Sequence, residues 1–482
     1  MGLMFQDRLN RSFVTFLVVL FGLSTWITIN GLWVELPLLV ALGIPEGYNL
    51  ASYLVIIIQL ANIGPLVYSI ADHFVRGNKL EAPCIYLGLF LGVVSCLLLV
   101  FFWDVTTFWE AIGEERSTAL LCLAFLLALK DTTSSVTFIP FMVRLDSAYM
   151  LWFFVGQGLS SLAPSLIALG QGVSNQNCVA NTTYTDEFSG ENCTTWMVET
   201  SPAKYPPVSF FWLLFATMVV AMVAFFILHS LTLAKKEFVV KPPKVDVPDN
   251  PDPEYHCRSI AGTAREYAKK HSVSSANEVS EEDAEESSEE PALQPGSSPQ
   301  RRKSKREYIL LFFLLAVVNA MRNGVLPSIQ SYSCGAYGFS AYLLATTLGH
   351  VANPVGCFVV LFFPKKSLAL VTSTCLVAVL AGCYCMATAA LSPTPPLQHD
   401  VAGTVIVVIA WVLVSGLFAY TKSSIGWILR HEPDNHKLLR WYGIVTQVGS
   451  LAGAVVMFPL VNVLHLFTAY DNDPCEGYPT CQ

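Results

Sequence analysis

The sequence predicts an all-α polytopic membrane protein with eleven transmembrane helices, six in a first half and five in a second. Three observations support this fold class: long apolar runs, an uneven distribution of basic residues between loops, and a motif pattern that occurs twice. Of the 482 residues, 53% are hydrophobic and only 13% are charged, and the mean hydropathy is +0.51. A soluble domain cannot bury so much apolar surface, whereas apolar runs of about 20 residues cross a bilayer.

The apolar runs define the candidate spans. The first run follows two basic residues, as in a secretory signal, but it continues without a small-residue cleavage site and is therefore expected to remain as the first helix. The eleven predicted spans are 12–36, 50–71, 84–103, 118–142, 149–169, 208–233, 308–330, 339–363, 367–391, 403–427 and 439–467.

Basic residues are concentrated in alternate loops, so the positive-inside rule places the N-terminus in the cytosol and leaves only Arg116 and Lys204 outside. Two glycosylation sequons begin at Asn181 and Asn192, in a loop predicted to be extracellular. An odd number of spans then places the C-terminus outside as well. Besides those of 234–306, the basic residues on the cytosolic side are Arg8, Arg11, Arg76, Lys79, Arg144, Lys365, Lys366, Arg430, Lys437 and Arg440.

A change of composition divides the chain. Residues 234–306 run through Pro-rich, Ser/Glu-rich and basic stretches, and a dense block of acid at 275–291 contributes to the net charge of −8. Such a segment cannot bury a core and is predicted to be a disordered cytosolic linker. The predicted domains are a six-helix half 1–233, the linker 234–306, a five-helix half 307–468 and an extracellular tail 469–482.

The two halves resemble each other in sequence. Four pairs of motifs occur in the same order on corresponding spans, which predicts an internal repeat. Because paired spans run in the same direction, the repeat is parallel, as in major-facilitator-like carriers, with the last helix of the second half missing. The pairs are Ile29-Asn30-Gly31 with Arg322-Asn323-Gly324, Ala61-Asn62 with Ala352-Asn353, Ser134-Ser135 with Ser423-Ser424, and Gln157 and Ser160 with Gln447 and Ser450.

Charged side chains within the spans form one set of candidate functional residues. Each costs about 2.5–3.5 kcal/mol at the bilayer centre, so each is expected to face a cavity or a partner. Asp131 and Lys422 lie near equivalent positions of spans four and ten; they form a structural ion pair between the halves, or they act in gating or cargo binding. Glu35 is either an outer gate or proton site, or a solvated carboxylate at the interface. The gating or proton candidates are Glu35, Asp131, His350, Arg322 and Lys422.

Amide and aromatic side chains within the spans form a second set. Singly, an amide can join helices and an aromatic can belong to the core or the interfacial belt. As a set on repeat-related helices, they suit a neutral cargo with hydroxyl or imide groups and a planar ring. The candidate substrate-binding residues are Asn30, Trp33, Gln59, Asn62, Gln157, Asn323, Tyr332 and Asn353.

Enzymatic and ATP-driven functions are not predicted. The sequence contains no Gly-x-x-x-x-Gly-Lys-Ser/Thr phosphate loop and no His-Glu-x-x-His motif in a span. Catalytic residues, metals, cofactors and nucleic-acid partners are therefore not expected. Five cysteines fall on the outer side and can form disulfides, in pairings that the sequence leaves open. They are Cys178, Cys193, Cys334, Cys475 and Cys481.

Five longer strings are more specific than hydropathy. They are WITINGLWVELPLL from Trp26, QLANIGPL from Gln59, SSVTFIPFM from Ser134, NGVLPSIQSYSC from Asn323 and GSLAGAVVMFPLVNV from Gly449. In these strings the chain resembles the vertebrate riboflavin transporters, solute carrier family 52. The resemblance implies riboflavin uptake at the plasma membrane, eleven spans with a cytosolic N-terminus, and a distant likeness to equilibrative nucleoside carriers. The position of Asp131 before a Thr-Ser-Ser stretch is similar to the family member whose uptake is stimulated by acid.

The sequence thus predicts a multi-pass carrier that takes up riboflavin by alternating access around a midplane site, with proton coupling or stimulation as a further expectation. Two alternatives stay open. A carrier of nucleoside-like heterocycles would use the same amides and aromatics. A cell-surface receptor would use the glycosylated outer loop, although eleven spans do not fit a seven-helix receptor.

Overall fold

The computed structural model describes residues 2–75, 80–110, 113–145, 147–173, 175–185, 192–230, 303–362, 367–398, 400–432 and 435–470. The described residues of 1–238 and 303–482 belong to one compact unit. Almost all of the expected linker, 234–306, lies outside the described residues. Helix α11 begins at Lys305, within the last residues assigned to that linker.

The described residues contain up to eleven candidate membrane spans, in agreement with the eleven predicted. Ten helices are long and apolar enough to cross a membrane, and an eleventh span is formed by α1 and α2, which meet at a bend of 53°. Helical geometry satisfies every backbone group within the span itself, which a bilayer requires. The helices of the first half are α1 (Gly2–Leu23), α2 (Ile27–Ala41), α3 (Leu50–Ala61), α4 (Ile63–Phe74), α5 (Glu81–Phe102), α6 (Thr118–Met142), α7 (Ser147–Gln171) and α8 (Pro207–Ser230). Those of the second half are α11 (Lys305–Ala320), η3 (Met321–Val325), α12 (Leu326–Gly335), α13 (Phe339–Phe362), α14 (Leu368–Ala390), α15 (Val401–Arg430) and α16 (Asn435–Asn462).

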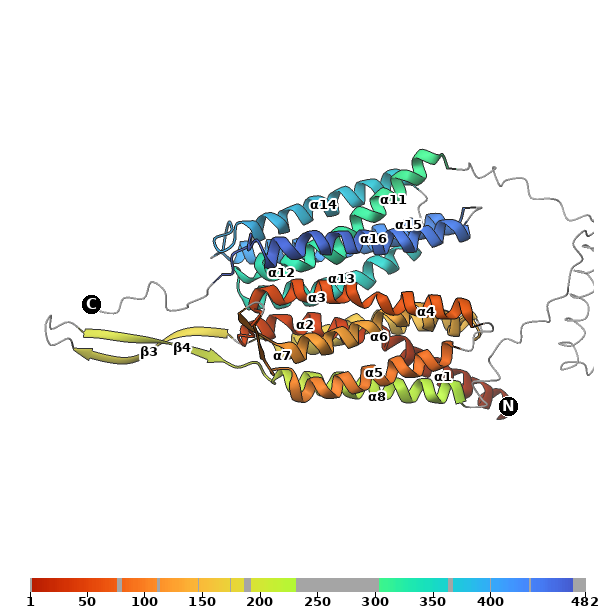
Figure 1. Cartoon of the computed structure of the whole chain (residues 1–482), viewed down its shortest axis with the longest axis horizontal. Helices are drawn as coiled ribbons and strands as arrows, with labels where there is room; N and C mark the ends of the chain where they lie inside the picture. The colour runs from red at the N-terminus through yellow and green to blue at the C-terminus, as the bar shows by residue number, and fades with distance from the viewer. Residues whose placement is uncertain are drawn as a thin grey trace, which may run out of the picture. The chain divides into compact units, whose positions relative to one another are not determined.

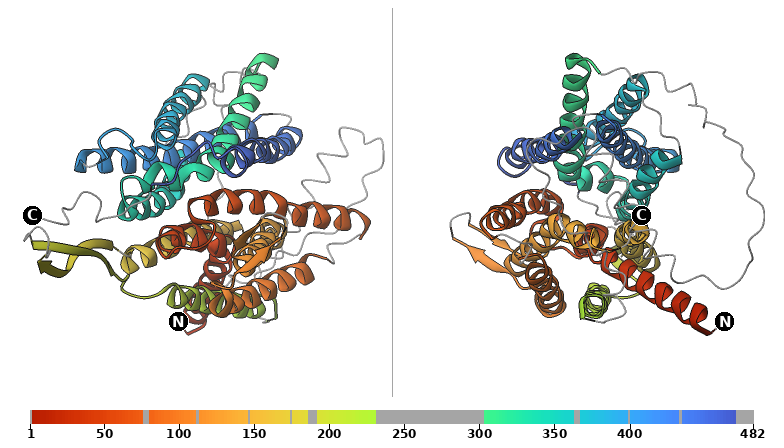
Figure 2. Two further views of the ribbon diagram at one scale, coloured as in Figure 1. Left: turned by 60° about the vertical axis from the view of Figure 1, so that its left-hand side comes forward. Right: turned by 90° about the vertical axis from the view of Figure 1, so that its right-hand side faces the viewer.

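The two halves lie side by side within this unit (Figures 1 and 2). Helices α2, α3 and α7 of the first half contact α12, α13 and α16 of the second. Corresponding helices also pack alike inside each half: α1 packs on α7 as α11 packs on α16, and α3 packs on α6 as α13 packs on α15. This agreement supports the parallel repeat inferred from the sequence motifs.

Small residues allow the first helix of each half to approach the fifth closely. A Cβ atom on Gly22 would lie 2.3 Å from the Phe153 carbonyl oxygen of α7, and one on Gly156 would lie 2.2 Å from the Val19 carbonyl oxygen of α1. In the second half, a Cβ atom on Gly453 would lie 2.4 Å from the Ala320 carbonyl oxygen. Close backbone packing of this kind is a main source of attraction between helices in lipid.

Two of the loops between helices form β-hairpins at one end of the bundle, called here the hairpin end. The first joins α5 to α6 and the second joins α7 to α8. Asn181 and Asn192, the predicted glycosylation sites, belong to the two strands of the second hairpin. The strands are β1 (Thr107–Trp109) with β2 (Glu114–Arg116), and β3 (Asn175–Thr185) with β4 (Asn192–Ser201).

The structure reduces the number of possible disulfide pairings. Cys178 is disulfide-bonded, whereas Cys334 is a free, buried thiol in α12. In the β3–β4 register, Cys193 lies opposite Tyr184, six residues along the strand from Cys178. Six strand residues span roughly 20 Å, whereas a disulfide needs Cα atoms within about 7 Å. A bridge between Cys178 and Cys193 therefore does not fit this hairpin.

The bend in the first span is held by an ion pair on α6. The Lys130 ammonium donates a hydrogen bond to the Ser24 carbonyl, which follows the end of α1. The Asp131 carboxylate accepts hydrogen bonds from the Ile29 backbone N–H, at 3.0 Å, and from the Thr28 hydroxyl, at 2.8 Å, in the first turn of α2. Lys130 Nζ lies 2.7 Å from Asp131 Oδ1, and both side chains are almost wholly buried. The cation thus meets the carbonyl end of one helix and the anion meets the N–H end of the next, as the helix dipoles favour.

The second half crosses the equivalent point without a break. Its first span passes through five residues of π-helix, η3, and continues directly into α12. When Ser134 is aligned with Ser423, the positions of Lys130 and Asp131 correspond to Ala419 and Tyr420. The ion pair is therefore absent at the equivalent position of the half whose helix is not broken.

The predicted pairing of Asp131 with Lys422 is wrong. Asp131 is bound by Lys130, Thr28 and the Ile29 backbone, all in the first half. Lys130 and Asp131 both point toward the break between α1 and α2. Their ion pair therefore stabilises the first half and does not join the two halves. Lys422 lies on α15, which belongs to the second half.

Removing Lys130 should destabilise the fold strongly. A Lys130→Met substitution leaves the Asp131 carboxylate buried without its cation, a change that typically costs about 3–5 kcal/mol. Adding Asp131→Asn keeps an acceptor for Ile29 and Thr28 without a charge and should recover most of this loss. Thermal unfolding of the purified chain in detergent would measure both effects, with Lys422→Met as a matched lysine control that changes stability little. Equal destabilisation by Lys130→Met and Lys422→Met would contradict this role.

Candidate functional site

The same hydrogen bond joins the first and fifth spans of each half. Asn30 Nδ2 donates to Ser160 Oγ at 3.4 Å, and Asn323 Nδ2 donates to Ser450 Oγ at 2.9 Å. Asn323 also donates to Asn319 Oδ1 at 3.3 Å. All four members of the two pairs occupy repeat-related positions. These asparagines join helices within their halves, while their partial exposure leaves them available to a ligand.

A second pair of amides marks the second span of each half. Asn62 lies at the break between α3 and α4, and its Nδ2 donates to Gln59 Oε1 at 3.3 Å. Its counterpart, Asn353, lies within the unbroken α13, and its Oδ1 is buried without a hydrogen-bond partner. A buried acceptor without a donor is costly unless something else supplies one. Asn353 therefore carries an acceptor whose hydrogen-bonding capacity is unmet among the described residues.

The predicted cationic residues gather in the second half. Arg322 in η3, His350 in α13 and Lys422 in α15 are partly exposed, and α15 packs against both η3 and α13. No ion pair involves Arg322 or Lys422 within the described part of the chain. Their repeat-related positions in the first half carry Ile29, Gln59 and Thr133, so the two halves present different electrostatic surfaces.

Glu35 is enclosed near the hairpin end of α2. The residue is only 1% exposed to solvent. Its Oε1 accepts a hydrogen bond from Gln171 Nε2 at 3.0 Å. Its Oε2 has no hydrogen-bond partner, and no cation forms an ion pair with it among the described residues. Of the two alternatives left by the sequence, a solvated interfacial carboxylate does not fit this burial.

The remaining predicted residues are divided between the core and the contact between halves. Trp33 is buried in the first-half core. Gln157 lies half-buried on α7, and its backbone carbonyl accepts the Ser160 hydroxyl at 2.7 Å. Tyr332 is buried at the hairpin end, where its hydroxyl is already bound by the other half. The structure thus brings the asparagines and serines of each half together but gives Tyr332 a role in closure.

Among the described residues, three hydrogen bonds join the two halves at the hairpin end, and a fourth joins the first half to the start of the tail. Ser331 Oγ donates to the Tyr48 carbonyl at 2.6 Å, and Tyr332 Oη donates to Asn49 Oδ1 at 2.6 Å. Asn462 Nδ2 donates to Ser52 Oγ at 2.7 Å. Tyr48 Oη donates to the carbonyl of Tyr470, at 3.3 Å. This group of contacts, called here the seal, closes the space between the halves at that end.

Most residues of the seal were not among the sequence candidates. Tyr48 and Asn49 belong to the short 3-10 helix η1 (Gly47–Asn49) between α2 and α3, and Ser52 follows in the first turn of α3. Their residue types are common in loops and helix ends, so only the packing of the second half against them reveals their role. Close packing adds to it, since a Cβ atom on Gly335 would lie 2.3 Å from the Tyr48 ring.

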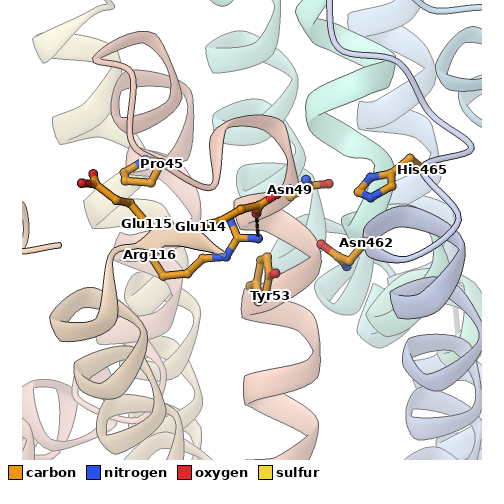
Figure 3. A pocket seen from close by; sticks show the side chains of 8 residues that line it. All are labelled: Pro45, Asn49, Tyr53, Glu114, Glu115, Arg116, Asn462 and His465. Atoms are coloured by element: carbon orange, nitrogen blue, oxygen red, sulfur yellow. Dashed lines mark hydrogen bonds and ion pairs between the residues drawn. The ribbon is translucent and has the colours of Figure 1, made fainter. Parts of the chain in front are cut away.

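A polar cavity of about 410 Å³ lies beside the seal (Figure 3). Residues of both halves line it: Pro45, Asn49 and Tyr53 around the start of α3, the three residues of β2, and Asn462 and His465 at the end of the second half. Arg116 of β2 forms an ion pair with Glu114, and its guanidinium lies 5.5 Å from the centre of the Tyr53 ring.

Two helical halves related by a parallel repeat have the architecture of major-facilitator-like folds. A crystal structure of a bacterial homologue of the human lysosomal transporter Spinster, in an inward-facing and unoccupied conformation, superposes with a TM-score of 0.50 at 13% identity, over 94% of this chain and 82% of that one. This likeness shows the fold alone.

The sequence comparisons define the family. Residues 10–469 match the family described as "Solute carrier family 52, riboflavin transporter". The chain is 40% identical to riboflavin transporter member 3-A of Danio rerio, over 94% of this chain and 96% of the relative. It is 38% identical to riboflavin transporter member 3 of Homo sapiens, over 94% and 97%. The chain therefore belongs to the solute carrier family 52 riboflavin transporters, a family of multi-pass membrane carriers.

Removing one bond of the seal should favour opening at the hairpin end. Tyr332→Phe deletes the hydroxyl that bonds Asn49, and a net loss of about 1 kcal/mol shifts the equilibrium roughly fivefold. Labelling of a cysteine at the neighbouring buried position, Gln330→Cys, by a membrane-impermeant reagent should accelerate accordingly. Tyr337→Phe is a matched control, because that hydroxyl bonds the Pro396 carbonyl at 2.8 Å within the same half. Equal acceleration in the two variants would exclude a specific role for Tyr332.

Proposed function

We propose that this chain takes up riboflavin across the plasma membrane by alternating access around a midplane site between its halves. The observation that carries the proposal is the family match over nearly the whole chain. The site adds consistency: the partly exposed Asn30 and Asn323 suit the ribityl hydroxyls, and the unpartnered Asn353 oxygen suits the imide N–H of the ring.

In this proposal the hairpin end is extracellular. The sequons at Asn181 and Asn192 belong to that end, where basic residues are few. Arg144 and Arg430 belong to the opposite end. The N-terminus is then cytosolic and the C-terminus extracellular. With the seal formed on the outer side, the described conformation is closed to the outside.

The basic residues of the second half orient the cargo within this site. Arg322, His350 and Lys422 offer donors from one half only, and the carbonyl edge of the flavin ring offers acceptors. The ring edge would therefore face the second half. The ribityl chain would face the amides of the first, Asn30, Gln59 and Asn62. No fixed countercharge is needed, because the interaction involves donors and neutral acceptors.

Uptake by cells tests the proposal directly. Cells expressing the chain should accumulate radiolabelled riboflavin well above mock-transfected cells, and excess lumiflavin should compete while uridine and adenosine should not. Asn323→Ala and Asn353→Ala should each lower uptake several-fold at equal surface expression, since each removes about one hydrogen bond worth roughly 1 kcal/mol. Competition by nucleosides would favour a heterocycle carrier of the nucleoside type. Wild-type uptake no higher than in mock cells would overturn the proposal.

Glu35 is the proposed site of acid stimulation. It is a buried carboxylate without an ion pair in the described residues, and a protonated carboxyl can be carried between conformations at lower cost than a charged one. Asp131 is already engaged at the helix break, and His350 lies in α13 beside the basic side chains of the second half.

A glutamine at position 35 mimics the protonated carboxyl at every pH. Uptake by the wild type should therefore rise as external pH falls, whereas Glu35→Gln should give a flat profile near the acid level. Initial rates of riboflavin uptake from mildly acidic to neutral pH would measure this, with the exposed Asp104→Asn as a carboxylate control that keeps the wild-type profile. A Glu35→Gln profile that still rises in acid would assign the proton site elsewhere.

A further inference from the structure

The cavity beside the seal is built from both halves of the carrier (Figure 3). Asn49, Tyr53 and Arg116 belong to the first half, and Asn462 and His465 belong to the second. The residues of β2 in the first hairpin line the cavity, so it lies at the hairpin end. It is therefore a distinct place from the site where the central asparagines lie.

Two of its lining residues carry buried polar atoms without partners. Nε of Arg116 and Oδ1 of Asn462 have no hydrogen-bond partner within the described part of the chain. Arg116 Nη2 pairs with Glu114, and Asn462 Nδ2 donates to Ser52 and to the Phe458 carbonyl. An unmet donor and an unmet acceptor each cost about as much as a lost hydrogen bond. A ligand that accepts a hydrogen bond from Arg116 Nε and donates one to Asn462 Oδ1 would remove both costs on binding.

The lining selects a neutral ligand rich in hydroxyl groups. Carboxylates of Glu114 and Glu115 accept hydrogen bonds, the Arg116 guanidinium donates, and Asn49, Asn462 and His465 can supply amide or imidazole groups. The described residues contain no group of three or more metal-ligating side chains. Vicinal hydroxyls both donate and accept, so a short polyol chain matches this mixture better than an anion or an apolar molecule does.

We propose that this cavity is a second, outer binding site that takes the ribityl chain of external riboflavin while the seal is closed. The identity of the ligand rests on the proposed function. The cavity volume of about 410 Å³ is ample for a five-carbon polyol chain with adjoining ring atoms. The Arg116 guanidinium lies over the Tyr53 ring. The Phe458 ring meets the Tyr53 ring edge to face, with the two ring centres 5.5 Å apart.

Occupancy of the outer site opposes opening of the carrier. Asn49 lines the cavity and also accepts the Tyr332 hydroxyl, and Asn462 lines it and also donates to Ser52. A ligand that touches both halves while these bonds are intact stabilises the sealed conformation by mass action. High external riboflavin should therefore slow its own uptake.

The test is the dependence of initial uptake on external riboflavin in cells expressing the full chain. Wild-type uptake should rise to a maximum and then decline, by as much as about fourfold at three times the dissociation constant of the outer site, because 1 + [L]/Kd is then about four. Glu115→Ala and His465→Asn should abolish the decline and leave uptake at low concentration unchanged. Asparagine is chosen at position 465 because the backbone there has a φ of 47°, which asparagine tolerates. Glu110→Gln, next to β1 but not lining the cavity, is the matched control and should keep the decline.

Direct binding separates failure of this inference from failure of the proposed cargo. Titration of the purified full chain with riboflavin, followed by flavin fluorescence, should show two sites in the wild type and one in Glu115→Ala. Ribitol should displace riboflavin only from the site that Glu115→Ala removes. A single site in the wild type, or two sites unchanged by both cavity variants, would overturn the outer site even if uptake is confirmed. Absence of riboflavin uptake with ribitol binding that depends on Glu115 would overturn the cargo and keep a polyol site.

Discussion

The Lys130–Asp131 ion pair is the interaction on which the first half depends. A membrane offers no water to the ends of a broken helix, so the break between α1 and α2 needs partners for its carbonyl and N–H groups. The pair supplies both from a single turn of α6. Two opposite charges placed together are also less costly in a bilayer than either alone. The direction of α2, and with it the placement of Asn30 and Glu35, follows from this one contact.

The two halves share their helix packing but differ in charge. Both halves keep the asparagine-to-serine bond between their first and fifth spans, so the packing that holds each half together is common to them. The charges differ: the first half buries its cation in the ion pair, and the second half leaves Arg322 and Lys422 unpaired among the described residues. Two halves that share this helix packing but differ in charge can rock as two similar bodies and still hold an asymmetric cargo in one orientation.

Much of the fold could be predicted from the sequence, because bilayer thickness and backbone hydrogen bonding restrict spans to long apolar helices. The predicted span 118–142 coincides with α6, and the motif pairs gave the repeat. The partner of Asp131 could not be predicted, because hydropathy does not show that the first span bends toward α6. The seal was missed for a related reason: Tyr48, Asn49 and Ser52 lie at a helix start, where polar residues are ordinary. The central amides were found because amides within spans are uncommon. Their contact with cargo remains a prediction.

The π-helix η3 has a consequence for how side chains are distributed along the seventh span. Its hydrogen bond from the Leu326 N–H to the Met321 carbonyl encloses one residue more than a regular α-helical turn. One additional residue rotates everything that follows by about 100° relative to a regular helix. Ser331 and Tyr332 therefore reach the seal from a helix face that a uniform helical wheel drawn from α11 would assign to other residues. A periodic pattern of lipid-facing and protein-facing positions along this span should change phase between Met321 and Val325.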